Sequence, residues 1–279
     1  MLSRIAGYQK RRDFLVLVDS DGCAMDTMVT KHTKCFCPCL IEEWDLQPWA
    51  AEIQESWNRI NMYTMTRGCN RFQALADMLA EVDATYTPVP GVEVLRNWAM
   101  NAPERSNAAL TEEIRRDGHT ILCKALAWSQ SVNAAVGKLT MDDKIPFPRV
   151  EEGLEAAHAF ADVIVLSGAN HDALVEEWDT YAMLENVDLV LSQDDGTKGR
   201  CIAALLEKGY PPKQVLMVGD APGDESAARK NGVFFYPVLA GREAESWLEF
   251  PEALERLRAG SYAIYGEEKL RQFLENLQG

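Results

Sequence analysis

Four acidic side chains in two short motifs are the residues of this sequence best suited to chemistry. Asp19 and Asp21 lie in Asp-Ser-Asp-Gly, and Asp220 and Asp224 lie in Gly-Asp-Ala-Pro-Gly-Asp. Aspartate and glycine also form turns, so either motif alone could simply end a strand. If both motifs meet, the carboxylates repel one another unless a cation or protons intervene. An oxygen-only ligand set of this size favours a hard divalent ion such as Mg²⁺.

A hydroxyl, a glycine and an ammonium group complete the set. Ser167-Gly168 follows one apolar run, and Lys198 begins the helical pattern after another. A hydroxyl with nearby backbone N–H groups, together with an ammonium beside carboxylates, can hold a phosphoryl group. Taken singly, Ser167 would be a helix cap and Lys198 a solvated lysine in a first helical turn. Their order and their common position just past buried strands favour a phosphoryl site.

The elements that must position these residues are indicated by the apolar pattern. Continuous runs of Val, Ile and Leu are typical of parallel strands buried on both faces. The predicted strands are 14–18, 163–166, 187–191, 215–218 and 233–238, and the predicted crossover helices are 151–161, 171–183, 198–208 and 225–231. This alternation predicts an α/β fold with a doubly wound parallel sheet, in which ligands bind at the carboxyl ends of the strands.

The interval between the first two strands is far longer than a crossover helix requires. Apolar residues at three-to-four-residue spacing predict helices there, and no strand is convincing; the clearest segments are 41–63, 70–82, 92–101 and 106–117. We therefore expect an all-helical domain at 29–144, inserted into an α/β domain formed by 1–28 and 145–279. The return is placed at Pro146-Phe147-Pro148-Arg149-Val150 because a strand ending in Ser167 follows closely.

In this order, the motifs resemble the four motifs of the haloacid dehalogenase superfamily of hydrolases. They are Asp19-Ser20-Asp21-Gly22-Cys23, Ser167, Lys198, and Gly219-Asp220 with Asp224. The resemblance implies a Rossmann-like core in which Asp19 is the nucleophile and Asp21 the general acid and base. It implies that Ser167 and Lys198 bind the phosphoryl group, with Gly168 beside them.

The same resemblance implies a Mg²⁺ site. Its ligands would be Asp19, the backbone carbonyl of Asp21, and Asp220, and Asp224 would help directly or through a water molecule. The helical insertion resembles a C1-type cap, although it is long for one. Arg67 and Arg71, in a polar stretch of this insertion, are candidate substrate-binding residues. The alternative is that this stretch is a helix cap with surface arginines.

The position of Asp21 bears on the reaction. A haloacid releases halide, which needs no proton, whereas a phosphate ester releases an oxygen that does. We therefore expect a Mg²⁺-dependent phosphatase that hydrolyses a small phosphorylated metabolite through an aspartyl phosphate. A phosphomutase of the same superfamily and a noncatalytic protein that binds phosphoryl ligands stay open, and so do the natural substrate and the oligomeric state.

Composition excludes other classes of function. The sequence has 28 Lys and Arg residues and 43 Asp and Glu residues. The resulting net charge of −15 opposes binding to nucleic acid or to anionic membranes. With 47% hydrophobic and 25% charged residues, the chain is typical of globular proteins. No uninterrupted apolar stretch reaches about 18 residues, and no export signal is evident, so a cytoplasmic protein is expected.

Overall fold

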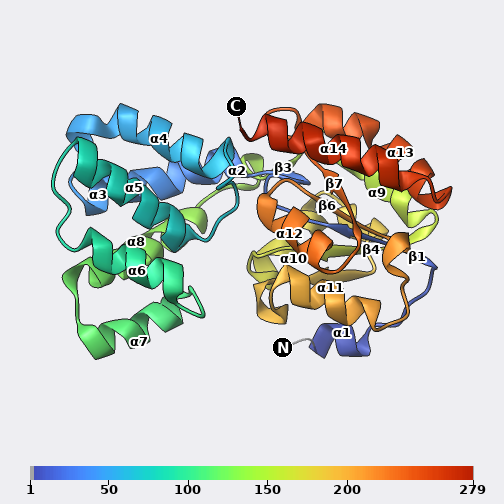
Figure 1. Ribbon diagram of the computed structural model, residues 1–279, viewed down its shortest axis with the longest axis horizontal. Helices are drawn as coiled ribbons and strands as arrows, with labels where there is room; N and C mark the ends of the chain where they lie inside the picture. The colour runs from blue at the N-terminus through green and yellow to red at the C-terminus, as the bar shows by residue number, and fades with distance from the viewer. Residues whose placement is uncertain (1–2, 279) are drawn as a thin grey trace. The chain divides into compact units, whose positions relative to one another are not determined.

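The computed structural model describes residues 3–278 and consists of two compact units (Figure 1). The α/β unit contains the chain up to Thr27 and from Met141 onward, and the helical unit is Met28–Thr140. The return to the α/β unit thus lies at 140/141, whereas the sequence pattern placed it at 144/145. Contacts within the α/β unit explain the difference, because the Tyr181 hydroxyl donates a 3.0 Å hydrogen bond to the carbonyl oxygen of Met141.

The α/β unit is built on a parallel sheet of five strands. They are β1 (Phe14–Val18), β4 (Ala161–Leu166), β5 (Leu189–Leu191), β6 (Val215–Gly219) and β7 (Phe234–Pro237). Their order is β5-β4-β1-β6-β7, and all neighbouring pairs are parallel. In the central strand β1, Val18 lies opposite Val165 of β4 and Val218 of β6. The predicted doubly wound parallel sheet is confirmed.

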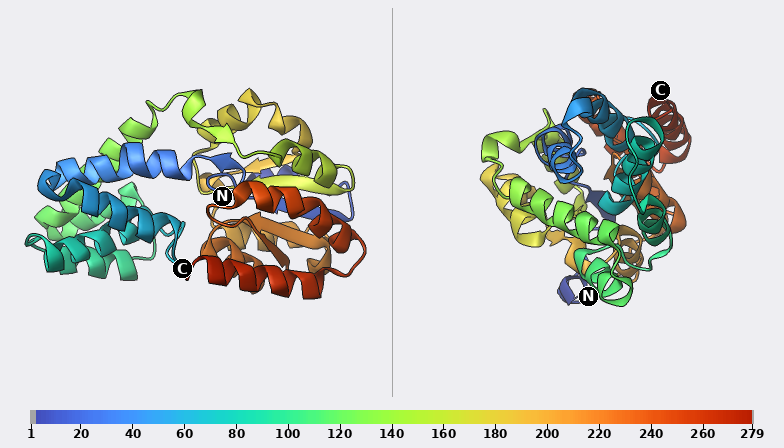
Figure 2. Two further views of the ribbon diagram at one scale, coloured as in Figure 1. Left: turned by 90° about the horizontal axis from the view of Figure 1, so that it is seen from above. Right: turned by 90° about the vertical axis from the view of Figure 1, so that its left-hand side faces the viewer.

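Helices cover both faces of this sheet (Figures 1 and 2). They are α1 (Ser3–Gly7), α9 (Val150–His158), α10 (His171–Thr180), α11 (Lys198–Leu206), α12 (Pro222–Lys230), α13 (Glu243–Arg258) and α14 (Tyr262–Asn276). Val16 and Val18 lie in an apolar core with residues of α9 and α13, whereas Leu15 and Leu17 share a second core with residues of α11 and α12. Burial on both faces explains why the strands read as continuous apolar runs.

A second, two-stranded sheet joins the segment that leads into the helical unit (the outgoing segment) to the segment that follows it (the returning segment). Strand β2 (Met25–Asp26) pairs antiparallel with β3 (Ile145–Pro146), and the backbone N–H of Phe147 donates to the carbonyl of Ala24 at 2.9 Å. The sequence analysis did not predict these strands, because two residues are too few to show an alternating pattern.

The main elements of the second unit are all helices. They are α2 (Met28–Lys31), a π-helix (His32–Phe36), α3 (Cys37–Glu43), a 3₁₀-helix (Gln47–Trp49), α4 (Ala50–Met62), α5 (Arg71–Thr85), α6 (Val92–Asn101), α7 (Asn107–Asp117) and α8 (Thr120–Val136). No strand occurs within 28–140, all of which the structure describes. Trp57, Phe72 and Trp128 are almost completely buried in its own core.

One helix prediction in this unit differs from the structure, and one helix was not delimited in advance. The helix expected over 41–63 is interrupted, because Asp45 adopts a left-handed φ of 56° and Pro48 follows shortly afterwards. Helix α8 lies in the region expected to be helical, but its bounds were not predicted. Across the part of the chain that the structure describes, no helix has both the length and the apolar character needed to cross a bilayer.

Candidate active site

Three buried carboxylates meet at the carboxyl edge of the parallel sheet. Asp19 directly follows β1, Asp220 directly follows β6, and Asp224 lies in the first turn of α12. One oxygen from each lies within 4.8 Å of the others, and their exposed fractions are 6%, 1% and 1%. The backbone N–H of Asp19 donates to the carbonyl of Val218 at 3.0 Å, which extends the pairing of β1 with β6 to the site.

The ammonium group of Lys198 lies between two of these carboxylates. Its Nζ is 2.8 Å from Oδ2 of Asp19 and 2.5 Å from Oδ1 of Asp224. Lys198 is the first residue of α11, and the Thr197 side chain caps that helix. Burial alone would lower the pKa of Lys198, but the negative charges of Asp19 and Asp224 more than offset this and raise it. The lysine is therefore charged at neutral pH.

The carboxyl group of Asp19 is under opposing influences. Burial raises its pKa, Lys198 lowers it, and the charges of Asp224 and Asp220 raise it again, so the pKa ends well above its ordinary value. When all four groups are ionised, three carboxylates and one ammonium leave a net charge of −2. One divalent cation would balance that charge, and an oxygen-only donor set suits Mg²⁺. The residues present therefore fit the predicted ion.

Asp21 lies in a tightly folded loop between β1 and β2. The turn uses Gly22, whose φ of 77° is left-handed, and the backbone N–H of Met25 donates to the carbonyl of Ser20 at 2.8 Å. The Thr27 hydroxyl donates to Oδ1 of Asp21 at 2.5 Å. The Asp21 carboxyl is not part of the acidic cluster found among residues 3–278. Its roles as acid and base, and as a metal ligand through its carbonyl, stay predictions.

Ser167 and Gly168 follow β4, the strand that lies beside β1 on the side opposite β6. The backbone N–H of Ser167 donates to the carbonyl of Leu191 at 3.0 Å, and its Oγ accepts from the N–H of Ala169 at 3.1 Å. Ser167 is only 4% exposed. The structure thus puts this loop at the same edge of the sheet as Asp19, and its phosphoryl-binding role stays a prediction.

Comparisons with solved structures give the fold of the chain. A candidate haloacid dehalogenase-like hydrolase from Bacteroides fragilis matches with a TM-score of 0.50 and 12% identity, over 84% of this chain and 92% of that chain. A candidate phosphoglycolate phosphatase from Lactobacillus delbrueckii subsp. bulgaricus has a TM-score of 0.49 and 14% identity, over 91% and 100%. A candidate beta-phosphoglucomutase from Bacteroides vulgatus has a TM-score of 0.48 and 15% identity, over 91% and 93%.

The chain has the haloacid dehalogenase-like fold. This confirms the fold that the motif resemblance implied. No protein-family model matches the sequence, and no curated protein does. At these identities the comparisons speak to the fold, and the chemistry has to be argued from the site itself.

Two features of the site in this haloacid dehalogenase-like fold escaped the sequence analysis, namely the packing role of Gly219 and the contact of Thr27 with Asp21. A Cβ added to Gly219 would lie 2.5 Å from the side chain of Asp224, so only glycine lets that carboxylate pack against β6. Oδ2 of Asp224 also accepts from the N–H of Ala221 at 3.1 Å, which holds the start of α12. Thr27 was missed as well, because a threonine six residues after Asp21 belongs to no pattern that signals a contact.

The two arginines predicted to bind substrate are engaged inside the helical unit. Arg67 is 4% exposed and donates to the carbonyl of Met62 at 2.8 Å. Arg71 donates to the side chains of Ser129 at 3.1 Å and Asn133 at 2.7 Å. Burial lowers the pKa of Arg71. Each therefore has a structural role within this unit, and a contact with substrate stays a prediction.

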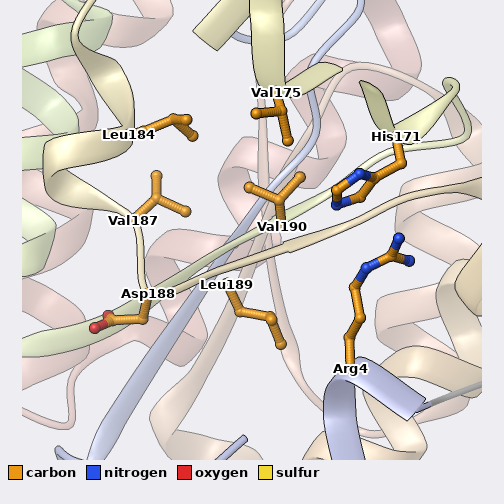
Figure 3. Close-up of a pocket in the computed structure, with 8 residues that line it drawn as sticks. All are labelled: Arg4, His171, Val175, Leu184, Val187, Asp188, Leu189 and Val190. Atoms are coloured by element: carbon orange, nitrogen blue, oxygen red, sulfur yellow. The ribbon is translucent and has the colours of Figure 1, made fainter. Parts of the chain in front are cut away.

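A cavity in the α/β unit lies apart from these residues. Its volume is about 330 Å³, and it is lined by Arg4, His171, Val175, Leu184, Val187, Asp188, Leu189 and Val190 (Figure 3). In Figure 3, Arg4 and His171 lie near each other on one side, and aliphatic side chains form most of the rest. None of the predicted catalytic or metal-binding residues lines this cavity.

Proposed function

We propose that this protein is a Mg²⁺-dependent phosphatase that hydrolyses a small phosphorylated metabolite through an aspartyl phosphate on Asp19. The observation that carries the proposal is the buried cluster of Asp19, Asp220 and Asp224 with Lys198 bridging the first and the last. A purely structural cluster would not need three buried carboxylates with a net negative charge, because uncompensated buried charge is costly.

Mg²⁺ held by Asp19, Asp220 and Asp224 would neutralise negative charge when a phosphate ester enters the site. At about 4 Å and an effective dielectric of about 20, one like-charge contact costs roughly 4 kcal/mol. Lys198 supplies a further positive charge from the protein itself. The hydroxyl of Ser167 and the backbone N–H groups beside Gly168 would orient the phosphoryl oxygens.

The chemical step divides between two carboxyl groups. An oxygen of Asp19 attacks phosphorus as the bond between phosphorus and the ester oxygen breaks, and Asp21 gives its proton to the departing oxygen. Asp21 then accepts a proton from a water molecule, whose oxygen attacks phosphorus and breaks the bond to Asp19. Inorganic phosphate leaves, and both side chains return to their starting states. The hydrogen bond from Thr27 would hold Asp21 at the site.

The first experiment measures release of p-nitrophenol from p-nitrophenyl phosphate, with and without Mg²⁺. The wild-type chain should hydrolyse the ester and should lose this activity with a chelator. Asp19→Asn should reduce turnover at least about 10³-fold, because the amide is not a nucleophile. Asp172→Asn is the matched control, since the Asp172 side chain is 99% exposed and should be dispensable. Undiminished turnover by Asp19→Asn would refute the assignment.

The same preparation separates the two other functions. Isomerisation of a sugar phosphate without release of inorganic phosphate would identify a phosphomutase. Binding of phosphate esters with neither reaction would identify a noncatalytic binding protein. A screen of phosphorylated metabolites, read by free phosphate, then determines the substrate.

A further inference from the structure

Helix α10 contacts both segments of the α/β unit that flank the helical unit. The indole N–H of Trp178 donates to Oγ of Ser20 at 2.9 Å, and both side chains are completely buried. The preceding residue, Glu177, forms a buried ion pair of 3.2 Å with Lys144 in the returning segment. Tyr181, just after the helix, donates to the carbonyl of Met141. The same helix therefore holds the outgoing loop and the returning segment.

The contact between α10 and the outgoing loop lies next to the residues that are predicted to carry out the reaction. Ser20 separates Asp19 from Asp21, and its carbonyl accepts backbone N–H groups that close the loop. A second indole acts on the same loop, because the N–H of Trp247 donates to the carbonyl of Cys23 at 2.8 Å. If the Ser20 hydroxyl moved away from Trp178, the buried indole N–H would be left without an acceptor. Leaving a buried donor unsatisfied is costly.

We propose that Trp178 is a positioning residue, whose hydrogen bond to Ser20 fixes the backbone between Asp19 and Asp21 for the chemical step. Because α10 begins four residues after Ser167, the bond also sets the first loop against the loop that carries Ser167. The catalytic part of this inference rests on the proposed phosphatase activity. The structural part, that the bond holds the loop, stands independently of it.

The test uses Ser20→Ala in the full chain, because it removes the acceptor and keeps the backbone N–H and nearly all of the packing. Ser246→Ala is the matched control. Ser246 is also a buried serine, 5% exposed, and its Oγ bonds to the backbone N–H of Leu239 and the carbonyl of Arg242, both at 3.0 Å. Both variants should lose similar thermal stability, so stability alone does not distinguish them.

Two measurements do distinguish them. Amide hydrogen exchange in 20–27 should be about tenfold faster in Ser20→Ala and unchanged in Ser246→Ala. With p-nitrophenyl phosphate, Ser20→Ala should lower kcat about tenfold and leave KM within about twofold, as expected for misplacement of reacting groups. Trp178→Phe should reproduce both effects and add little to Ser20→Ala in the double variant. This second variant also serves if Ser20→Ala fails to fold.

The outcomes separate the claims. Equal exchange in 20–27 for Ser20→Ala and Ser246→Ala would overturn the inference. Faster exchange with unchanged kcat would overturn its catalytic part, because the bond would then hold the loop without serving the reaction. A wild-type chain that hydrolyses no phosphate ester would instead refute the proposed function, and the exchange data would still decide whether Trp178 holds the loop.

Discussion

At the scale of single residues, the site depends on close approaches that leave no room for substitution. Gly219→Ala would place a methyl group 2.5 Å from Asp224 and force its carboxylate away from Lys198. We expect the free energy of unfolding to fall by about 1–3 kcal/mol, as in other overpacked sites. Gly223→Ala, in the first turn of α12 and with open space around the new methyl, should change it by less than about 0.5 kcal/mol. Urea unfolding of both variants gives the comparison.

The raised pKa of Asp19 predicts how the metal responds to pH. Burial first, and then Asp224 and Asp220, raise this pKa, so protons compete with Mg²⁺ for the carboxylate. Mg²⁺ affinity should therefore rise as pH increases from the acidic range toward neutral, and binding should release protons. Calorimetric titration in buffers of different ionisation enthalpy measures both effects. The pH dependence should be weaker in Asp19→Asn, and identical pH profiles in the two proteins would contradict the prediction.

The residue types of the site could be predicted from the sequence, but their partners could not. Asp19 and Asp220 were recognisable because each directly follows a strand that reads clearly as buried, and Asp224 because it lies in the same short motif as Asp220. The contacts of Thr27 and Trp178 with the first loop were not predictable, since they depend on how distant segments pack rather than on any local pattern. Nor does the sequence show that Arg71 is held by Ser129, 58 residues away.

At the scale of secondary structure, a buried network at the other edge of the sheet anchors the N-terminal segment. Oδ2 of Asp162, at the start of β4, accepts the backbone N–H groups of Arg11 and Arg12 at 2.9 and 3.0 Å and the hydroxyl of Tyr210. The Tyr8 hydroxyl lies 3.0 Å from that of Tyr210. Burial and the bond to Asp162 raise the pKa of Tyr210, which keeps it a donor.

Removing that donor should weaken the anchor. Tyr210→Phe should lower the free energy of unfolding by about 1–2 kcal/mol, because two buried polar groups lose a partner. The exposed Tyr63 provides the control, and Tyr63→Phe should have little effect. Thermal denaturation followed by circular dichroism measures both. A Tyr210→Phe variant as stable as wild type would show that the Tyr210 hydroxyl contributes nothing to anchoring.

Strands and helices differ in how well the sequence predicted them. β1 matches its predicted range residue for residue, because an apolar run bounded by polar residues leaves little choice of ends. The predicted helix 151–161 overran its end, since α9 stops at His158 and Ala161 already begins β4. Alanines and phenylalanine in 156–160 fit either element, and only pairing with β1 decides where the strand begins.

At the scale of the whole chain, the two units have separate apolar cores. The pairing of β2 with β3 sets Asp26 opposite Ile145, so the ends of the chain that flank the helical unit lie together without it. Replacing Met28–Thr140 with a short Gly-Ser linker should therefore leave an α/β unit that unfolds cooperatively. Its Mg²⁺ affinity should stay within about tenfold of that of the full chain.

Circular dichroism and calorimetry on the shortened chain test this expectation. A shortened chain that keeps far-ultraviolet but loses near-ultraviolet dichroism would be a molten globule, and would show that the sheet needs the helical unit for specific packing. The long interval and its helical apolar spacing were enough to predict an inserted unit, whereas the two-residue strands that close its boundary were too short to predict.

The placement of the seven tryptophans gives the molecule a built-in optical reporter. Five lie in the helical unit, at 44, 49, 57, 98 and 128, and the two in the α/β unit both donate their indole N–H groups to the loop after β1. With phenylalanine at those five positions, the remaining intrinsic fluorescence would come from Trp178 and Trp247 alone. Stopped-flow emission could then follow this loop in real time as a ligand arrives, without any attached dye.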